Sequence, residues 1–334
     1  MELLTEDQLL DLAASFRIAR AIYAAARLGI AEVLSEPMSA TEVAERINAD
    51  PVATRELLRA LASRGVFAEP SAGLFGRTSA SRALLPAAEG GSKEVILGWV
   101  GHPAVYRGME RLDDGVRAGR PAFELNHGGG FFDWLGSHPD ELDSYASSVG
   151  GEDPEEFRSL LDVVDFSAFA VLGDIGGGGG GLVRAAVERS EHLLAVVVEL
   201  PTVASRTEAL IAAAGLSARI TVVAADARVE IPTGPDCYVM STVLRYFEDS
   251  TAVDVLRRIR DALPAGGTLM IVEMPQPPGP AQAPHAMKSL VEYSLSGGRD
   301  RTVEEYEHML ASAGFSAVTS RCWEEPYWIM SATS

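Results

Sequence analysis

Three carboxylates, a run of glycines and one arginine are the residues whose types and spacing suggest chemistry in this chain of 334 residues. Asp174, Glu199 and Asp226 each end a short, apolar, β-branched run. Six consecutive glycines, 176–181, follow the first of these acids and precede the helical pattern LVRAAVERS. Glycine permits positive φ angles and lets a ligand approach the backbone closely. A strand, a glycine loop and a helix in this order predict a cofactor loop.

Two adenosine cofactors are compatible with this loop. Gly176, Gly178 and Gly181 match the GxGxxG pattern of nicotinamide dinucleotide sites. Asp174 would repel a pyrophosphate, however, and could face a cation, while Glu199 can accept hydrogen bonds from both ribose hydroxyls. Acids after three successive strands therefore favour a positively charged sulfonium nucleoside over a diphosphate.

The elements that position these residues alternate along the second half of the chain. Helical patterns separate five short β-branched runs, namely AVLGDI, LLAVVVEL, RITVVAAD, DCYVMSTVL and TLMIVEM. Strands that alternate with helices predict a parallel sheet covered on both faces. We therefore expect an α/β fold, with a doubly wound C-terminal domain from about Phe157. In such a domain ligands bind outside the carboxyl ends of the strands.

The first third of the chain predicts a different, mostly helical domain. Ser39 and Glu42 form a capping-box pattern, and Asp50 followed by Pro51 is a second helix start. The run VFAEPSAGLFGRT then predicts a β-hairpin. Two helices and a hairpin form a winged helix, but residues 39–85 carry six arginines against five acids. Because a DNA-binding face should be basic, a packing or dimerisation module is favoured.

Composition limits the partners and the location of the protein. The formal net charge is −19, which disfavours nucleic acid and anionic membranes as partners. No apolar run is long enough to cross a membrane, and the N-terminal residues lack a signal-peptide pattern. Neither of the two cysteines, Cys237 and Cys322, stands in a metal-ligand cluster. We expect a cytoplasmic protein without a bound metal.

Several motifs in order resemble the S-adenosylmethionine-dependent O-methyltransferases of the caffeate and bacterial polyketide type. VLGDIGGGGGG is similar to the family's DxGGGxG loop, and VVVELP to its second-strand acid followed by Leu-Pro. The segments DALPAGGTLMIVE, GGRDRTVEEYEHMLASAGF and RAGRPAFELNHGGGFFDWL also match. The resemblance covers nearly the whole chain. It implies a homodimer with a winged-helix dimerisation domain at 1–90, a helical linker at 91–156 and a Rossmann-like, S-adenosylmethionine-binding domain at 157–334.

The resemblance also implies site residues. A small phenolic or polyketide acceptor of secondary metabolism would lie under the helices around Met287 and Tyr293. The residues that match the family's cofactor positions are Asp174, Gly176, Gly178, Glu199, Leu200, Asp226, Ala227 and Ser241.

One position departs from the family. The family has Leu-His-Asp-Trp after its fourth strand, and the histidine is its general base, but this chain has Arg245 there. A guanidinium stays protonated and has no acceptor, so Arg245 cannot be a general base. The two acids that accompany the family's histidine have counterparts in Glu273 and Asp300. Arg245 is predicted to bind an anionic acceptor beside these acids, or else to form a salt bridge with one of them.

Three activities are compatible with an arginine at this position. A methyltransferase could align an already acidic acceptor without a base. A relative that keeps the cofactor site could catalyse a hydroxylation, a cyclisation or a rearrangement without transferring methyl. A regulator with a winged helix and a vestigial pocket is disfavoured by the acidic charge. The first activity is the main prediction and the second is its alternative.

Overall fold

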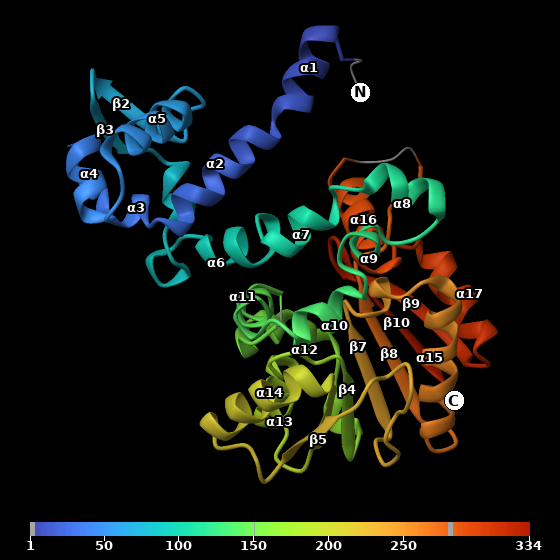
Figure 1. Ribbon diagram of the computed structural model, residues 1–334. Coiled ribbons are helices and arrows are strands. Elements are labelled where there is room, and N and C mark those ends of the chain that lie inside the picture. The colour runs from blue at the N-terminus through green and yellow to red at the C-terminus, as the bar shows by residue number, and fades with distance from the viewer. Residues whose placement is uncertain (1–3, 150, 280–282) are drawn as a thin grey trace. The chain divides into compact units, whose positions relative to one another are not determined.

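The computed structural model describes residues 4–149, 151–279 and 283–334. The chain folds into two compact units, residues 1–106 and 107–334 (Figure 1). Each unit has a hydrophobic core of its own.

The first unit is a winged helix, as the sequence predicts. Ser39 and Glu42 form the expected capping box, in which the Ser39 N–H donates to the Glu42 carboxylate at 2.8 Å. Asp50 accepts a hydrogen bond from the Ala53 N–H at 2.8 Å, with Pro51 at the first helical position. The elements are α1 (Glu6–Ala14), α2 (Phe16–Arg27), α3 (Ile30–Val33), β1 (Met38–Ser39), α4 (Ala40–Arg46), α5 (Pro51–Ala62), β2 (Phe67–Ser71) and β3 (Leu74–Arg77).

Short helical turns follow the hairpin of β2 and β3, whose sheet has the order β1-β3-β2. These turns are η1 (Ser81–Leu84), η2 (Ala87–Glu89), α6 (Lys93–Val95), the π-helical turn η3 (Ile96–Val100) and α7 (Pro103–Gly108), within which the boundary between the units falls.

The second unit is built on a seven-stranded sheet of order β6-β5-β4-β7-β8-β10-β9. The first five strands in this order are parallel, and the last two form an antiparallel hairpin that the five strand patterns do not indicate. This doubly wound arrangement confirms the predicted fold class. The strands are β4 (Val171–Ile175), β5 (Leu194–Glu199), β6 (Ile220–Ala224), β7 (Cys237–Ser241), β8 (Thr268–Glu273), β9 (Ser316–Glu324) and β10 (Tyr327–Thr333).

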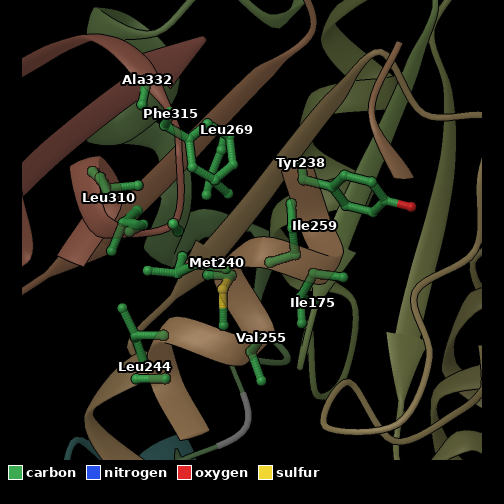
Figure 2. Packing of buried hydrophobic residues seen from close by; sticks show 14 of the residues in the cluster. Ile175, Tyr238, Met240, Leu244, Val255, Ile259, Leu269, Leu310, Phe315 and Ala332 are labelled. Atoms are coloured by element: carbon green, nitrogen blue, oxygen red, sulfur yellow. The ribbon is translucent and has the colours of Figure 1, made fainter. Parts of the chain in front are cut away.

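Helices cover both faces of this sheet. On one face, side chains of α15 (Asp249–Ala262) and α17 (Val303–Ser312) pack on those of β7, β8 and β10, as Val255, Ile259 and Leu310 do around Met240 (Figure 2). On the other face lie α12 (Arg158–Val163), α13 (Gly181–Arg189) and α14 (Pro201–Ala213). Apolar residues at helical spacing on these helices bury their stripes against the sheet, which stabilises the fold.

A further set of helices precedes the sheet in the chain, and one lies between β8 and α17. These are α8 (Leu112–Ala118), α9 (Ala122–His127), α10 (Phe131–Gly136), α11 (Pro139–Val149) and α16 (Ala283–Ser296). Short 3-10 turns complete the unit: η4 (Pro154–Phe157), η5 (Phe166–Ala168) and η6 (Leu244–Tyr246).

The sheet order reverses between β4 and β7, which makes the carboxyl ends of these two strands a topological switch point. The chain leaves β7 through Thr242, which has a φ of 56°. A positive φ is uncommon for a β-branched residue and requires support from its surroundings. Here the Thr242 N–H donates to the carbonyl of Val272 at 2.8 Å. The turn directs the residues after β7 into η6.

Candidate functional site

A pocket of about 870 Å³ opens at the switch point, within the second unit. Its wall includes the ends of β4, β5 and β7, the glycine loop, and residues of α10, α11 and α16. Ligand pockets of this size hold cofactors and drug-sized molecules. The position therefore agrees with the general rule for open α/β sheets.

The glycine loop forms the floor at the end of β4. Gly176 and Gly178 have φ angles of 68° and 53°, which L side chains rarely adopt. The N–H of Gly178 donates to Glu199 at 2.8 Å, and its carbonyl accepts from the Thr207 hydroxyl at 2.6 Å. The loop is thus held by β5 and α14, with its backbone on the pocket wall.

Other glycines of the run are required by close packing rather than by the pocket. A Cβ at Gly179 would collide with Glu152, and one at Gly181 would collide with the carbonyl of Gly151. Arg206 of α14 fixes this neighbouring segment, since its Nε and Nη2 bond to Oε1 of Glu152 at 2.8 and 2.6 Å. The glycine run therefore forms part of the pocket wall and also allows the segment with Gly151 and Glu152 to pack closely against it.

Two buried carboxylates face the pocket, and no arginine or lysine of the described residues pairs with them. Asp174 is 2% exposed, and its Oδ1 has no hydrogen-bond partner among the described residues. Burial, with a contribution from Glu199, raises the pKa of Asp174 to about 7. Burial also raises the pKa of Glu199, whose carboxylate accepts from the N–H groups of Gly178 and Leu200. An orphaned buried carboxylate in a pocket fits a cationic ligand.

The remaining predicted cofactor positions also lie on the pocket wall. Asp226 differs from Asp174, because Arg228 binds its carboxylate through Nε and Nη2 at 3.0 and 2.7 Å. Although burial opposes the shift, the hydrogen bonds from Arg228 hold the pKa of Asp226 below its usual value. The wall contains all eight predicted positions: Asp174, Gly176, Gly178, Glu199, Leu200, Asp226, Ala227 and Ser241.

The structure brings Arg245, Glu273 and Asp300 together, but it buries them off the pocket wall. Arg245 is 1% exposed, and its Nη2 lies 2.7 Å from Glu273 and 3.4 Å from Asp300. Burial acts to lower the pKa of Arg245, yet the carboxylates around it outweigh burial and raise it. The turn at Thr242 places the arginine against the end of β8.

This geometry corrects the predicted role of Arg245 as the group that binds an acceptor anion. Its guanidinium is already occupied by carboxylates of the chain, and none of the three predicted catalytic residues lines the pocket. The alternative prediction, a salt bridge with Glu273 or Asp300, is the arrangement that the structure has. Arg245 neutralises buried charge, and that contribution is structural.

Sequence reasoning missed Glu292, the third acid of this cluster. Glu292 lies on α16 and is fully buried, with its Oε1 at 3.3 Å from Nη1 of Arg245 and 2.8 Å from Nζ of Lys288. Burial raises the pKa of Glu292 to about 9. A glutamate in the apolar pattern AMKSLVEYSLS is a signal that could have marked it.

Only one of the two residues of α16 that were predicted to contact the acceptor lies on the pocket wall. Tyr293 lies on the pocket wall, whereas Met287 is 57% exposed and lies off it. Four aromatic side chains that sequence reasoning missed form one side of the pocket. They pack edge to face, with Phe132 against Tyr246 at 5.3 Å between ring centroids and Phe131 against Tyr145, also at 5.3 Å. Such a wall suits a planar, aromatic ligand.

Among the described residues, no group of three or more His, Cys, Asp or Glu side chains could hold a metal ion. No helix in the described ranges is both long and apolar enough to cross a membrane.

Comparisons with known proteins agree with this geometry. Residues 109–316 match the family model of the O-methyltransferase domain, and residues 10–87 match the O-methyltransferase dimerisation domain. The chain is 30% identical to a phenazine O-methyltransferase of Lysobacter antibioticus, over 92% of this chain and 90% of that protein. It is also 30% identical to the aclacinomycin 10-hydroxylase of Streptomyces purpurascens, over 84% of this chain and 76% of that protein.

Among the similar solved structures that contain ligands is one with both a methyl donor and an aromatic acid. It is an O-methyltransferase from neocarzinostatin biosynthesis in complex with S-adenosylmethionine and 2-hydroxy-5-methyl naphthoic acid. The TM-score is 0.84 at 25% identity, over 95% of this chain and 96% of that one.

Proposed function

Because the chain belongs to the family of S-adenosylmethionine-dependent O-methyltransferases, we propose that it methylates a small aromatic or polyketide-type acceptor of secondary metabolism. The observation that supports this most is the pocket itself. The unpartnered carboxylate of Asp174, the carboxylate of Glu199 and the glycine loop form its cofactor end, and an aromatic wall forms another side.

The residues of the pocket fit S-adenosylmethionine, which supplies an electrophilic methyl group on a positively charged sulfur. We assign Asp174 to the cationic part of this molecule, because its carboxylate is buried without a cation of the chain. Glu199 is assigned to the ribose hydroxyls. Each of its two oxygens accepts a hydrogen bond from a backbone N–H group. These bonds hold the carboxylate in place and leave further lone pairs for a ligand.

The chain accelerates the reaction by positioning. Tyr145, Tyr246 and the two phenylalanines hold the ring of the acceptor, and the strand ends hold the methyl donor. Orientation of two reactants can supply about 7–11 kcal/mol of the barrier without any acid or base. Arg245 is buried and ion-paired with Glu273 and Glu292. The rate of methyl transfer therefore depends more on positioning of the reactants than it would in a relative with a histidine base.

The first unit supports assembly as a homodimer. It carries the matched dimerisation domain, and helix α1 exposes Leu9, Leu10 and Leu12. An exposed apolar stripe on a helix is typical of an interface. Light scattering of the purified protein checks this, since a monomer at micromolar concentration would contradict it. The cytoplasmic location stays a prediction.

A second activity, hydroxylation or another reaction without methyl transfer, is favoured by one observation. The position of the family's general base is closed by an ion-paired arginine, and one relative that is 30% identical is named a hydroxylase. Such an enzyme would use the same pocket and keep the sulfonium as a fixed positive charge.

One assay distinguishes the two activities. The purified protein is incubated with S-adenosylmethionine and a panel of aromatic acceptors, and S-adenosylhomocysteine is quantified beside the product by mass spectrometry. Methyl transfer predicts that one molecule of S-adenosylhomocysteine forms for each molecule of methylated product. With dioxygen and a reductant also supplied, a product that is 16 mass units heavier, formed without S-adenosylhomocysteine, would contradict methyl transfer and support hydroxylation.

A further inference from the structure

The charged residues on the pocket wall limit which charge the acceptor can carry. The described wall carries seven carboxylates and three arginines, and no lysine or histidine is among its residues. An excess of acids disfavours a negatively charged ligand.

Each arginine of the wall is already paired. Arg120 bonds to Glu124 at 3.1 Å, Arg228 holds Asp226, and Arg299 lies 3.0 Å from Asp249. Arg245 is buried in its own cluster. An acceptor that arrives as a carboxylate or a phenolate would therefore find no free cation of the chain on the described wall.

The described wall also carries no histidine, lysine or cysteine that could remove a proton from a phenol at neutral pH. The Tyr145 and Tyr246 hydroxyls share a hydrogen bond of 3.3 Å, and burial raises the pKa of both, that of Tyr246 to about 12. Asp174, Glu199 and Asp226 belong to the cofactor end.

The other four carboxylates of the wall are poor bases for a buried acceptor. Asp133, Glu248 and Asp249 are exposed, and Glu124 is half-buried in its pair with Arg120. A phenol in this pocket would have to lose its proton unaided before it attacks.

Resting on the proposed methyl transfer, we propose that the reacting atom of the acceptor is the nitrogen of an uncharged arylamine, so that the protein is an N-methyltransferase. A neutral amine already carries the lone pair that a phenol gains only by deprotonation. The nitrogen attacks the methyl carbon, the N–C bond forms as the C–S bond breaks, and the sulfur keeps the electron pair and becomes a thioether. The resulting ammonium then releases its proton to water, for which no base is required before attack.

The aromatic wall and the acidic surplus both suit this acceptor. The rings of Phe131, Phe132, Tyr145 and Tyr246 can stack on or abut an aromatic amine. The positive charge that develops on nitrogen is favoured by the excess of carboxylates over arginines on the wall, whereas the charge of a phenolate is disfavoured by it. The same electrostatics therefore select the amine in binding and in the reaction.

The test compares isosteric pairs that differ only in the reacting atom. The full-length protein and S-adenosylmethionine are incubated with each compound of three pairs. The pairs are aniline and phenol, 2-naphthylamine and 2-naphthol, and 2-aminoanthracene and 2-hydroxyanthracene. Formation of S-adenosylhomocysteine is followed between pH 6 and pH 9. With S-adenosylmethionine kept saturating at every pH, we expect the amine of at least one pair to react at least tenfold faster than its phenol at pH 7, with a rate that is flat over this range. The rate with a phenol should instead rise roughly tenfold per pH unit below its own pKa.

A binding measurement gives a second readout that does not depend on turnover. Affinities of 2-naphthylamine, 2-naphthol and 2-naphthoate are measured by calorimetry with S-adenosylhomocysteine present. We expect 2-naphthoate to bind at least tenfold more weakly than 2-naphthylamine, because the wall carries seven carboxylates against three arginines.

The outcomes separate this inference from the proposed function. S-adenosylhomocysteine formed with phenols and not with amines would overturn the nitrogen acceptor and leave methyl transfer intact. Equal or tighter binding of 2-naphthoate would overturn the electrostatic argument. No S-adenosylhomocysteine with any of the six compounds, although S-adenosylmethionine binds, would overturn methyl transfer to both classes of acceptor, and this inference with it.

Discussion

Two groups of buried acids lie at the carboxyl ends of the same sheet, and they differ in where their cation comes from. At β8 and α16, Glu273 and Glu292 lie with Asp300 around Arg245. At β4 and β5, Asp174 and Glu199 are buried as deeply, but the described chain gives them no arginine or lysine.

The difference shows which group is a binding site. Charges buried without partners cost several kcal/mol, so a fold keeps them only where something compensates. The first group, here called the Arg245 cluster, is compensated within the chain and lies off the pocket. The second is open to the pocket, where its compensation is a ligand that carries positive charge. The methyl donor is such a ligand.

The largest expected effect is on the stability of the Arg245 cluster. The substitution Arg245→Met removes the cation that lies near all three buried acids and leaves Lys288, which reaches only Glu292 and Asp300. We therefore expect the free energy of unfolding to fall by about 3–5 kcal/mol. Denaturation by urea measures this loss. Arg257→Met is the matched control, because the pair of Arg257 with Asp254 is exposed and should contribute less than about 1 kcal/mol. Equal stability of the two variants would contradict a structural role for Arg245.

The next effect concerns the acids at the cofactor end. Asp174→Asn removes the charge but keeps the shape, and we expect the Kd for S-adenosylmethionine to rise by roughly 100-fold, as for loss of one partner of a buried charge pair. Calorimetry measures the affinity, and Asp254→Asn on the exposed face of α15 is the control. An unchanged affinity in Asp174→Asn would show that the orphaned carboxylate does not face the ligand.

The same carboxylate predicts a pH dependence. The pKa of Asp174 in the free protein is about 7, so below pH 7 its proton must leave before a cation can bind. The Kd for S-adenosylmethionine should therefore rise roughly tenfold per pH unit from pH 7 towards pH 5, and be flat above pH 8. Titrations at half-unit steps test this. If Asp174→Asn keeps the wild-type slope, another group is responsible for it.

The smallest effect distinguishes the members of the Arg245 cluster. A carboxyl group whose folded pKa is raised destabilises the protein increasingly as pH rises from its unfolded pKa, near 4.5, towards 9. Glu292→Gln removes this titration, and we expect a gain of about 1 kcal/mol at pH 7 that is smaller at pH 5. Glu208→Gln at an exposed position of α14 should show no such trend. A loss of stability that grows with pH would mean that Glu292 is ionised in the fold.

Local patterns could predict the sheet and the cofactor end, because each acid directly follows its own strand. The eight predicted positions at that end depend on residues within a few places of a strand terminus, and all lie on the pocket wall. The direction of Arg245 could not be predicted in this way. It depends on the turn at Thr242 and on Glu292, which is 47 residues away in the sequence.

The aromatic wall escaped prediction for a related reason. Phe131, Phe132 and Tyr145 come from short helices whose register relative to the sheet is set by tertiary packing. Tyr246 stands next to Arg245 but points to the other side, since only Tyr246 lines the pocket. Pattern and resemblance place a residue at a strand end, and the backbone turn then decides which side chain meets the ligand.

A crystal structure with S-adenosylhomocysteine and 2-naphthylamine tests the contrast between the two groups of acids most directly. We expect the adenosyl group to contact Glu199, and the charged α-amino group of S-adenosylhomocysteine to lie near Asp174. Arg245 should remain bound to Glu273, Glu292 and Asp300. An Arg245 guanidinium that has left this cluster and contacts the acceptor would contradict the account, as would a ligand that leaves Asp174 without a partner.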